Sequence, residues 1–524
     1  MKQQWAAIVI TIVLLVTKVH HIATLDILAI FPFSGMSHFH MFHVVSRALV
    51  ARGHNVTVVS HFPRTLQDTP VDQEQNSPQG TFIDYSLAGT VPMFENYTVD
   101  DVTGSGYIEQ ALLILQDGLD NCEGIMSSGR LDELMRSRAV FDLVLVEIFN
   151  TGCYVSVANY FGAPVVGITS TSLYPWWASV TGAGDVVMPS YVPVNLLPFT
   201  ARMTFTERLL NTAMLFTMRT YYKYKYEPEA QRIVDKYLGK LNSTVSQSVN
   251  NVNALIVNTH FAFGDTRPLL PGIIEIGGCT YKSPKPLTED LENYVSSARR
   301  GVIYFSMGSI VKGSSISAEH SLAMIKAFSR LEGYHVLWKW EDEPPHPEVR
   351  SNNVKFVPWM PQFDVLSHPN VKLFISHGGL NGILEALYSG VPVVGIPMFA
   401  DQFSNVNYIV YNECGLRLSL DQIDEETVYD TISTVLENDK YTTNIKRLSQ
   451  LYWDRDLDPI DTAVYWIEYL ARHRENLLTK PTIPDQWYEQ CLIDVAVMMI
   501  VTAATAVYLT IRIFGTCYQT IVGS

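Results

Sequence analysis

Residues 356–402 bring together glycines, amides, carboxylates and an aromatic ring in an order that suits the successive parts of one ligand. Two apolar runs, 371–375 and 392–396, flank a Gly-Gly turn and a helical pattern, which predicts the strand, helix, strand order of a parallel sheet. The helix after His377 and Gly379 begins with backbone N–H groups that have no partner within the helix. These groups and the helix dipole favour a phosphate, so we expect a pyrophosphate at this turn.

The side chains around the turn match the remaining parts of a nucleotide sugar. Asn381 and Glu385 are four residues apart and share a helix face, where an amide can meet the phosphates and a carboxylate can meet a ribose diol. Trp359 offers a flat ring on which a base can stack, and Gln362 offers a donor and an acceptor for the edge of that base. The stretch therefore predicts a nucleoside site beside the phosphate site.

Two further residues follow the next predicted strand. Asp401 and Gln402 form an acceptor and amide pair of the kind that binds sugar hydroxyls. Taken singly, each feature has a plainer explanation, because most Gly-Gly turns only provide positive φ angles and a lone tryptophan such as Trp359 is usually part of a core. The hypothesis of a nucleotide-sugar site depends on the order and spacing of the whole set.

A histidine far upstream is a candidate for acid–base chemistry. His38 lies where a predicted strand, 25–31, passes into a predicted helix, 39–52, at the end where open α/β sheets place their chemistry. A neutral imidazole there can take a proton from a hydroxyl during group transfer. Two alternatives stay open: a structural histidine at a helix start, and a metal site shared with His40 and His43.

The order of the motifs resembles that of the UDP-glycosyltransferases, whose signature runs W-x-P-Q, then H-G-G-x-N-G-x-x-E, and ends in D-Q. Every one of those letters is present between residues 356 and 402, and residues 461–469 are similar to insect-type members. The resemblance, which runs from Leu25 to the tail, implies an α/β protein of the GT-B fold with two Rossmann-like domains facing a cleft. It also implies a UDP-sugar co-substrate and no required cofactor. The donor-binding residues that it implies are Ser309, Trp359, Gln362, His377, Gly379, Asn381, Glu385, Asp401 and Gln402.

The resemblance also assigns His38 as the general base. Family members have Ser-His followed by an aromatic residue at this turn, and residues 37–39 match that pattern. In better-known members an Asp after a later strand polarises the imidazole. Here that strand leads into Glu147, which is one methylene longer. We expect Glu147 to pair with His38, with Asn150 and Thr151 as alternative partners.

The composition limits the possible partners. Lys and Arg number 37 against 52 Asp and Glu, a formal charge of −15, so nucleic acid is not an expected partner and any anion site must be local. Six cysteines are scattered without a C-x-x-C pattern, which indicates neither a zinc site nor a disulfide framework, although one bridge is left open. No metal ligand set is evident, so we expect the helix end to hold the diphosphate without a required ion.

Both ends of the chain predict membrane targeting. Residues 1–24 combine a basic start, an apolar run and small residues, which is typical of a signal peptide, with an uncleaved anchor as the alternative. Residues 491–513 contain a charge-free run just long enough to cross a bilayer, with a buried core helix as the alternative. Arg512 assigns the tail, 514–524, to the cytosol. We therefore expect a single-pass protein of the endoplasmic reticulum membrane with a lumenal body.

Between these ends we expect two domains, an N-terminal acceptor-binding domain over residues 25–280 and a C-terminal UDP-sugar-binding domain over residues 281–490. A linker rich in Lys, Ser and Pro joins them. A lumenal body would expose the sequons at Asn55, Asn96 and Asn242 to glycosylation. Asn55 is the doubtful one, because it opens a predicted strand where a glycan would disturb packing.

Two features of the first domain bear on the acceptor. Trp176 and Trp177 belong to an aromatic cluster that suits either a lipophilic acceptor or core packing. A long helical stretch, residues 205–237, either roofs the acceptor cleft or lies on the membrane face. The sequence leaves both choices open.

These observations predict an inverting transferase that moves a hexose from a UDP-sugar to a hydroxyl of a small lipophilic acceptor, such as a phenol, a steroid or a xenobiotic in detoxification. Insect-type relatives favour glucose over glucuronate, a choice that Asp401 and Gln402 alone do not settle. The alternative is a catalytically silent relative that binds ligands or acts as a scaffold, whereas a lectin or receptor ectodomain would not need a diphosphate site. A homo-oligomer is left open.

Overall fold

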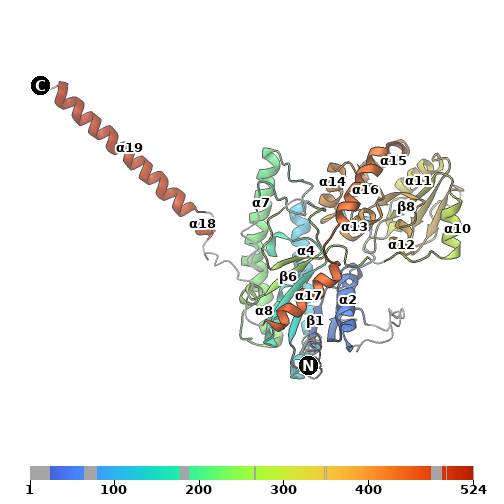
Figure 1. Cartoon of the computed structure of the whole chain (residues 1–524), viewed down its shortest axis with the longest axis horizontal. Helices are drawn as coiled ribbons and strands as arrows, with labels where there is room; N and C mark the ends of the chain where they lie inside the picture. Colours follow the sequence, from blue (N-terminus) through green and yellow to red (C-terminus); the bar gives the residue numbers. More distant parts are fainter. Residues whose placement is uncertain are drawn as a thin grey trace, which may run out of the picture.

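The computed structural model describes residues 24–63, 80–177, 188–264, 267–281, 283–346, 349, 351–473, 487–490 and 492–522. The expected signal peptide, residues 1–24, lies outside the described residues except for Thr24. Two α/β units, each built on its own sheet, make up the body, and a long C-terminal helix extends away from them (Figure 1).

The first sheet has seven strands in the order β3-β2-β1-β4-β5-β6-β7, and every pair is parallel. Its central strands are apolar and buried on both faces, as expected of a sheet covered by helices on both sides. The order reverses between β1 and β4, which is where such sheets bind ligands. The strands are β1 (Asp26–Phe31), β2 (Asn55–Ser60), β3 (Phe82–Ser86), β4 (Leu143–Glu147), β5 (Val165–Thr169), β6 (Ala254–Val257) and β7 (Ile273–Glu275).

The second sheet has six parallel strands in the order β10-β9-β8-β11-β12-β13, with its reversal between β8 and β11. The strand, helix, strand order predicted around the Gly-Gly turn is confirmed as β11, α13 and β12. The turn therefore lies at the reversal point of its sheet. The strands are β8 (Gly301–Ser306), β9 (Tyr334–Lys339), β10 (Val354–Val357), β11 (Val371–Ser376), β12 (Val393–Gly395) and β13 (Gly415–Arg417).

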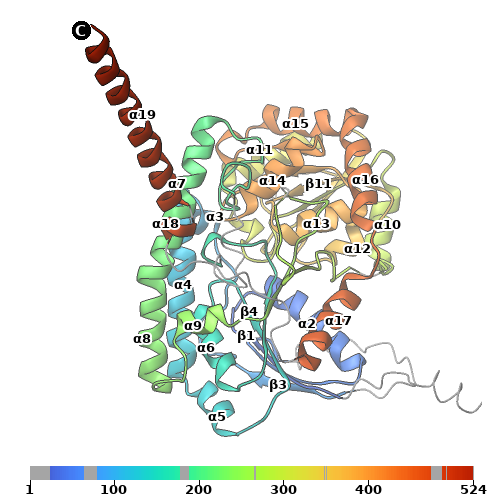
Figure 2. The same cartoon turned by 60° about the vertical axis from the view of Figure 1, so that its left-hand side comes forward.

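Helices cover both sheets (Figures 1 and 2). Around the first sheet they are α2 (Met36–Ala51), α4 (Tyr107–Ser127), α5 (Arg130–Arg136), α6 (Gly152–Tyr160), α7 (Phe205–Tyr221), α8 (Glu227–Leu238) and α9 (Val245–Asn250). The short helix α3 (Val99–Val102) comes from the first half of the chain, but its Val99 is buried in the core of the second sheet. Around the second they are α10 (Glu289–Ser297), α11 (Ala318–Ser329), α12 (Gln362–Leu366), α13 (Leu380–Ser389), α14 (Gln402–Tyr411), α15 (Glu425–Glu437) and α16 (Asp439–Trp453). The last helices are α17 (Pro459–Arg472), α18 (Trp487–Gln490) and α19 (Ile493–Val522). The long helix predicted over residues 205–237 is formed by α7 and α8, joined by a π-helical turn, Tyr222–Tyr226.

Helix α2 begins earlier than the predicted residue 39. Gly35 adopts an extended conformation as the N-cap, so the helix starts at Met36. His38 is therefore part of the first helical turn rather than the residue before the helix. Its side chain is buried there, which fixes its direction.

Helix α17 crosses back to the first sheet, although the sequence analysis assigns its residues to the second domain. Its buried face belongs to the same core as β1 and α2. Inside this contact, His54 Nδ1 accepts a hydrogen bond from the backbone N–H of Leu25 at 3.2 Å, so the proton of the neutral ring is on Nε2. Nε2 donates to Glu468 Oε1 at 3.1 Å. The division of the chain at residue 280 stays a prediction, and α17 connects the two sides of it.

Helix α19 contains an apolar segment, residues 493–516, of 24 residues, none of it buried. At 1.5 Å per residue it is about 36 Å long, enough for a hydrocarbon core of about 30 Å. Its exposure contradicts the alternative of a buried core helix. The helix fits a single-pass membrane anchor.

One disulfide joins the described part of the first domain. Cys122 of α4 is bonded to Cys153 of α6, with a Cα–Cα distance of 6.6 Å. The sequence left one bridge open without its partners, because the 31-residue separation gives no hint of the pairing.

We expect replacement of Glu468 by Ala to destabilise the chain by about 2–3 kcal/mol, because it leaves the buried His54 N–H without an acceptor. Urea unfolding of the detergent-solubilised full chain, followed by tryptophan fluorescence, measures the change. The matched control is Asp461→Ala on the same helix, which removes an ion pair with Arg52 in which both side chains are about half exposed. That change should cost no more than about 1 kcal/mol. Equal effects of the two substitutions would contradict a clamping role for Glu468.

Candidate active site

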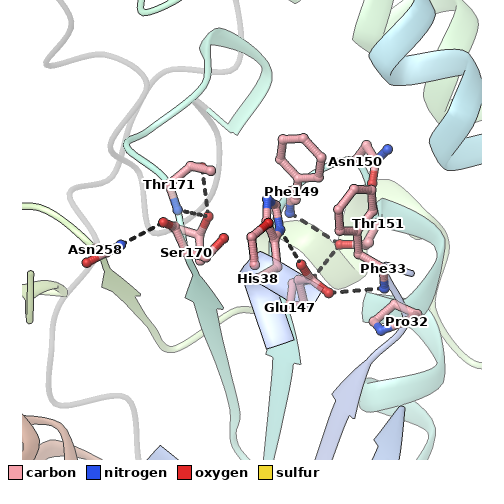
Figure 3. Close-up of polar contacts among 12 residues, drawn as sticks. Pro32, Phe33, His38, Glu147, Phe149, Asn150, Thr151, Ser170, Thr171 and Asn258 are labelled. Atoms are coloured by element: carbon pink, nitrogen blue, oxygen red, sulfur yellow. Dashed lines mark hydrogen bonds and ion pairs between the residues drawn. The ribbon is translucent and has the colours of Figure 1, made fainter. Parts of the chain in front are cut away.

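His38 and Glu147 meet at the reversal point of the first sheet. Glu147 is the last residue of β4, and Ile30 pairs with Val146, so the end of β1 lies beside it. The turn after β1 then brings His38 back over the strand ends. His38 Nδ1 lies 2.9 Å from Glu147 Oε1, as Figure 3 shows. The dyad expected from the sequence is therefore present as a geometric pair, with Glu in place of the usual Asp.

The second oxygen of the carboxylate has its own partner. Glu147 Oε2 accepts a hydrogen bond from the backbone N–H of Phe33 at 3.1 Å. Because Glu147 is an acceptor, Nδ1 of His38 is the donor, which leaves Nε2 as the basic atom of the ring. The rings of Phe33 and Phe149 lie 4.5 and 4.8 Å from the imidazole and hold its plane. The arrangement can accept a proton at Nε2 and stabilise the resulting cation.

Thr151 and Asn150, the two alternative partners of His38, make hydrogen bonds to other groups. Thr151 Oγ1 donates to Glu147 O at 2.5 Å and accepts from the N–H of Phe149 at 3.2 Å, which shapes the turn after β4. Asn150 Nδ2 donates to Ile114 O at 2.9 Å and to Asp117 Oδ2 at 3.1 Å. Both residues position the segment that follows Glu147.

Trp176 and Trp177 are each only 2% exposed. Their indole N–H groups both donate to Phe149 O, at 2.9 and 2.6 Å. Both tryptophans therefore lie in the core and hold Phe149, whose ring contacts His38. Their contact with an acceptor stays a prediction.

The Gly-Gly turn and the loop after β8 enclose His377. Ser306 pairs with Ser376 across β8 and β11, so the two turns lie side by side. A Cβ atom on Gly308 would lie 2.5 Å from the His377 ring, and one on Gly379 would also lie 2.5 Å from it. Gly308 also has a φ of +84°, so both space and backbone conformation require glycine there.

The electrostatics keep this histidine neutral. Burial and the nearby charge of Lys339 lower the pKa of His377 to about 4. Its Nδ1 is buried and has no hydrogen-bond partner among the described residues. A neutral imidazole has one N–H donor and one acceptor nitrogen, so the unpartnered Nδ1 at the start of α13 can make one hydrogen bond to a ligand, and it can donate to a phosphate oxygen only in the tautomer with the proton on Nδ1. Ser309 follows on the same loop and is exposed.

Lys339 is a residue that the sequence analysis missed. Its Nζ donates to Gly308 O at 2.8 Å and to Glu341 Oε1 at 2.6 Å, and it lies 5.4 Å from the centroid of the Trp359 ring. The available signal was that Lys339 is a charged residue at the end of a buried apolar strand, β9. Its place next to the phosphate turn follows only from the order of the strands.

The residues predicted for the nucleoside come together. Gln362 Nε2 donates to Glu385 Oε2 at 2.5 Å, and its Oε1 accepts from the hydroxyl of Tyr304 at 3.2 Å. Burial raises the pKa of Glu385 to about 7, and the bond from Gln362 opposes the rise. Trp359 is 68% exposed, so its ring is free to stack and the core interpretation of it is wrong.

Asn381 connects the two domains. Its Nδ2 donates to Ser37 O at 3.1 Å, and its Oδ1 accepts from Asn258 Nδ2 at 3.1 Å. Asn258 also donates to Ser170 O at 2.8 Å (Figure 3). The bond to Ser37 brings the start of α13 to the residue before His38. Asn258 was not predicted, because a lone amide after a strand carries no signal of its own.

Asp401 and Gln402 differ in their availability. Gln402 Oε1 accepts from the N–H groups of Met398 and Phe399 at 2.9 and 3.2 Å, so it shapes the turn before α14. Asp401 Oδ2 accepts from Asn405 Nδ2 at 2.9 Å. Burial raises the pKa of Asp401, and the hydrogen bond from Asn405 opposes the rise.

The metal alternative for His38 finds no partners. Within the described ranges there is no group of three or more His, Cys, Asp or Glu side chains that could hold a metal ion. His38 pairs with Glu147 instead of with His40 or His43.

Two Rossmann-like units, whose reversal points face each other across the Asn381 contact, make up the GT-B fold. In solved structures this arrangement is similar to the glycotransferase of kitacinnamycin, with a TM-score of 0.57 and 17% identity over 86% of this chain and 98% of that one. It is also similar to Os79 of O. sativa in complex with U2F and trichothecene, with a TM-score of 0.56 and 17% identity over 85% of this chain and 100% of that one.

Residues 27–524 match the family described as UDP-glucoronosyl and UDP-glucosyl transferase. The chain is 33% identical over 491 residues to UDP-glucosyltransferase 2 of Dactylopius coccus, covering 91% of this chain and 90% of that protein. It is 30% identical over 496 residues to UDP-glucuronosyltransferase 2A2 of Homo sapiens, covering 92% and 90%. The chain belongs to this UDP-glycosyltransferase family. It is a transferase that uses a UDP-sugar donor and needs no cofactor.

We expect Gly308→Ala to weaken UDP binding about tenfold or more, because the new methyl group displaces the His377 ring. Isothermal titration of the full chain with UDP measures the dissociation constant. Gly129→Ala is the matched control, since Gly129 also has a positive φ, +70°, but nothing lies within 4 Å of the added Cβ. An unchanged UDP affinity of Gly308→Ala would separate His377 from the diphosphate site.

Proposed function

We propose that this enzyme transfers glucose from UDP-glucose to a hydroxyl of a small, largely aromatic acceptor, with inversion at the anomeric carbon. The observation that carries the proposal is the buried pair of His38 and Glu147, which Asn381 connects to the start of the donor helix α13. A base that lies beside the donor turn is what a single displacement requires.

In the proposed step, Nε2 of His38 accepts the hydroxyl proton while the acceptor oxygen forms a bond to the anomeric carbon. The bond between that carbon and the diphosphate oxygen breaks, and its electron pair leaves with UDP. The added negative charge meets the N–H groups at the start of α13 and the neutral His377 ring. Glu147 stabilises the imidazolium, and one displacement at one carbon inverts its configuration.

The surroundings of His38 support an aromatic acceptor. The cluster around the imidazole extends from Phe33 to Phe94, with ring centroids 5.1 Å apart, and from Phe149 to Tyr174 at 5.4 Å. Flat apolar walls favour phenols and steroids, whose rings can stack or meet edge to face. Xenobiotics of this kind would make the reaction a detoxification step.

The polar groups at the cleft support glucose over glucuronate as the donor sugar. Asp401, Asn258 and Asn381 are an acid and two amides, which suit neutral sugar hydroxyls. A glucuronate carboxylate beside Asp401 would bring two acids together and raise the cost of ionising both.

The compartment we propose is the lumen of the endoplasmic reticulum. The Cys122–Cys153 bridge is typical of an oxidising compartment, and α19 supplies the anchor. Asn96 and Asn242 are exposed and are the proposed glycosylation sites. Asn55 is a poor acceptor, because its side chain bonds Asp26 at 2.9 Å and Thr81 at 2.7 Å.

We expect His38→Ala to lower kcat by a factor of about 10² to 10⁴ while UDP binding is unchanged, since the base acts only on the acceptor proton. Glu147→Gln should lower kcat less, because an amide oxygen can still accept from Nδ1 but cannot balance the imidazolium charge. The assay follows UDP release from UDP-glucose by membranes carrying the full chain with a panel of phenols and steroids. His40→Ala on the same helix is the control.

Undiminished transfer by His38→Ala would remove the proposed mechanism. Absence of UDP release with every donor and acceptor would favour a catalytically silent ligand-binding protein. Faster transfer from UDP-glucuronate than from UDP-glucose would leave the mechanism intact and overturn only the choice of sugar.

We expect the affinity for UDP-glucose to fall as the pH is lowered through about 7, where Glu385 becomes protonated. The ribose diol donates to a carboxylate, so binding favours the ionised form that predominates above this pKa, with a limit of about tenfold per pH unit below it. UDP-glucose is the suitable probe, because its diphosphate does not titrate in this range. Dissociation constants at pH 5.5 to 8.5 should lose this dependence in Glu385→Gln. A slope that persists in this variant would mean that another group titrates.

A further inference from the structure

Helix α7 directs a row of large apolar side chains to the outside of the molecule. Its inward face carries Asn211, Met214, Leu215 and Met218, all buried. A surface helix normally carries charged and polar residues on the opposite face. The outward side chains here, which we call the α7 face, are Phe205 (72% exposed), Leu209 (57%), Leu210 (53%), Phe216 (47%) and Tyr224 (67%).

The charge of this segment is opposite to that of the chain. Residues 205–226 hold four basic side chains and a single acidic one, whereas the whole chain has a formal charge of −15. The acidic residue, Glu207, is engaged at the helix start, where its Oε2 accepts from the N–H of Thr204 at 2.7 Å. Lys223 and Lys225 are exposed beside Tyr224. The face is therefore apolar along α7 and basic at its end.

The position of α7 leaves this face uncovered by the described parts of the chain. In both views α7 forms the outer layer of the first unit, and α4 packs against α8, which continues the line of α7 (Figures 1 and 2). In both views α18 and the start of α19 also lie on the side of the body that carries α7. A contiguous apolar surface of this kind marks a contact with a partner or a membrane.

The inward face of α7 is held by hydrogen bonds to the segment before it. Asn211 Oδ1 accepts from the N–H of Val194 at 2.7 Å, and its Nδ2 donates to Pro189 O and Val192 O, both at 2.9 Å. These bonds bind α7 to the segment that lies under it. The outward row consequently points away from the acceptor site.

We propose that the α7 face lies on the lipid bilayer that α19 enters, with its apolar side chains at the acyl boundary and Lys223 and Lys225 among the head groups. Apolar residues flanked by lysines are the pattern of surfaces that lie in a membrane interface, where the long lysine side chains reach the polar head-group region. The anchor keeps the bilayer within reach, since the chain between residues 473 and 487 extends at most about 50 Å. In this position the apolar side chains of the α7 face are buried in lipid instead of exposed to water.

The test uses the full chain, one copy per lipid nanodisc, with phosphatidylcholine, phosphatidylserine and a phosphatidylcholine that carries a diazirine on its acyl chain. After illumination, cross-linked peptides are identified by mass spectrometry. We expect lipid cross-links on residues 205–225 as well as on α19. The double substitution Leu209→Glu with Phe216→Glu should lower the α7 cross-links about tenfold and leave those of α19 unchanged.

Val140→Glu is the matched control, because Val140 is an apolar residue 81% exposed outside the α7 face. It should leave both sets of cross-links unchanged. Wild-type cross-links confined to α19 would overturn the proposal. In larger discs that hold several copies, protein–protein cross-links through α7 in place of lipid cross-links would overturn it in favour of a second copy. The wild-type result decides by itself if the double variant folds poorly.

Discussion

The carboxylate of Glu147 is 1% exposed, and a charge in that position needs hydrogen-bond donors to stay ionised. Both donors come from the segment after β1, the backbone N–H of Phe33 and the ring of His38. They reach the carboxylate only because β1 and β4 are neighbours in the sheet, with Ile30 opposite Val146. The hydrogen bonds of Glu147 therefore require the strand order, the turn at Gly35 and the orientation of His38 at the same time. A shift of one strand would leave the buried carboxylate without partners.

A similar constraint acts across the cleft. Asn381 has both ends of its amide occupied by the first domain, at Ser37 and Asn258. A donor that uses this amide for its phosphates has to replace those bonds with its own. Donor binding and the contact between domains thus compete for one side chain, so the two equilibria are linked. These two bonds can be exchanged, because each is a neutral amide bond worth about 1 kcal/mol net.

The sequence was sufficient where the information is local. The apolar runs 371–375 and 392–396 predicted β11 and β12 to within a residue of their ends. Tertiary contacts decided the rest. Trp176 and Trp177 have side chains that suit a lipophilic ligand, yet both satisfy their N–H groups on Phe149 inside the core.

Other features depend on which distant segments become neighbours, and no local pattern carries that information. Lys339 enters the donor site because β9 lies beside β8, and Asn258 enters it because β6 ends opposite α13. The return of α17 to the first sheet rests on a buried pair, His54 and Glu468, separated by more than four hundred residues. In each case the residue type alone predicts no function, and only the position in the folded chain identifies the residue.

The proposed donor turn has to attract an anion although the chain as a whole is negatively charged. A chain of formal charge −15 has to hold a diphosphate, and its one buried cation at this turn, Lys339, is already paired with Glu341. The neutral His377 adds no charge, because burial and Lys339 keep its pKa low. Attraction for the anion must then come mainly from dipoles, the N–H groups at the start of α13 and the backbone around Gly308 and Gly379. Dipoles held by a helix and by two sterically required glycines do not reorient when charge develops on the leaving UDP, so in the proposed mechanism the same turn binds the donor and favours the departure of UDP.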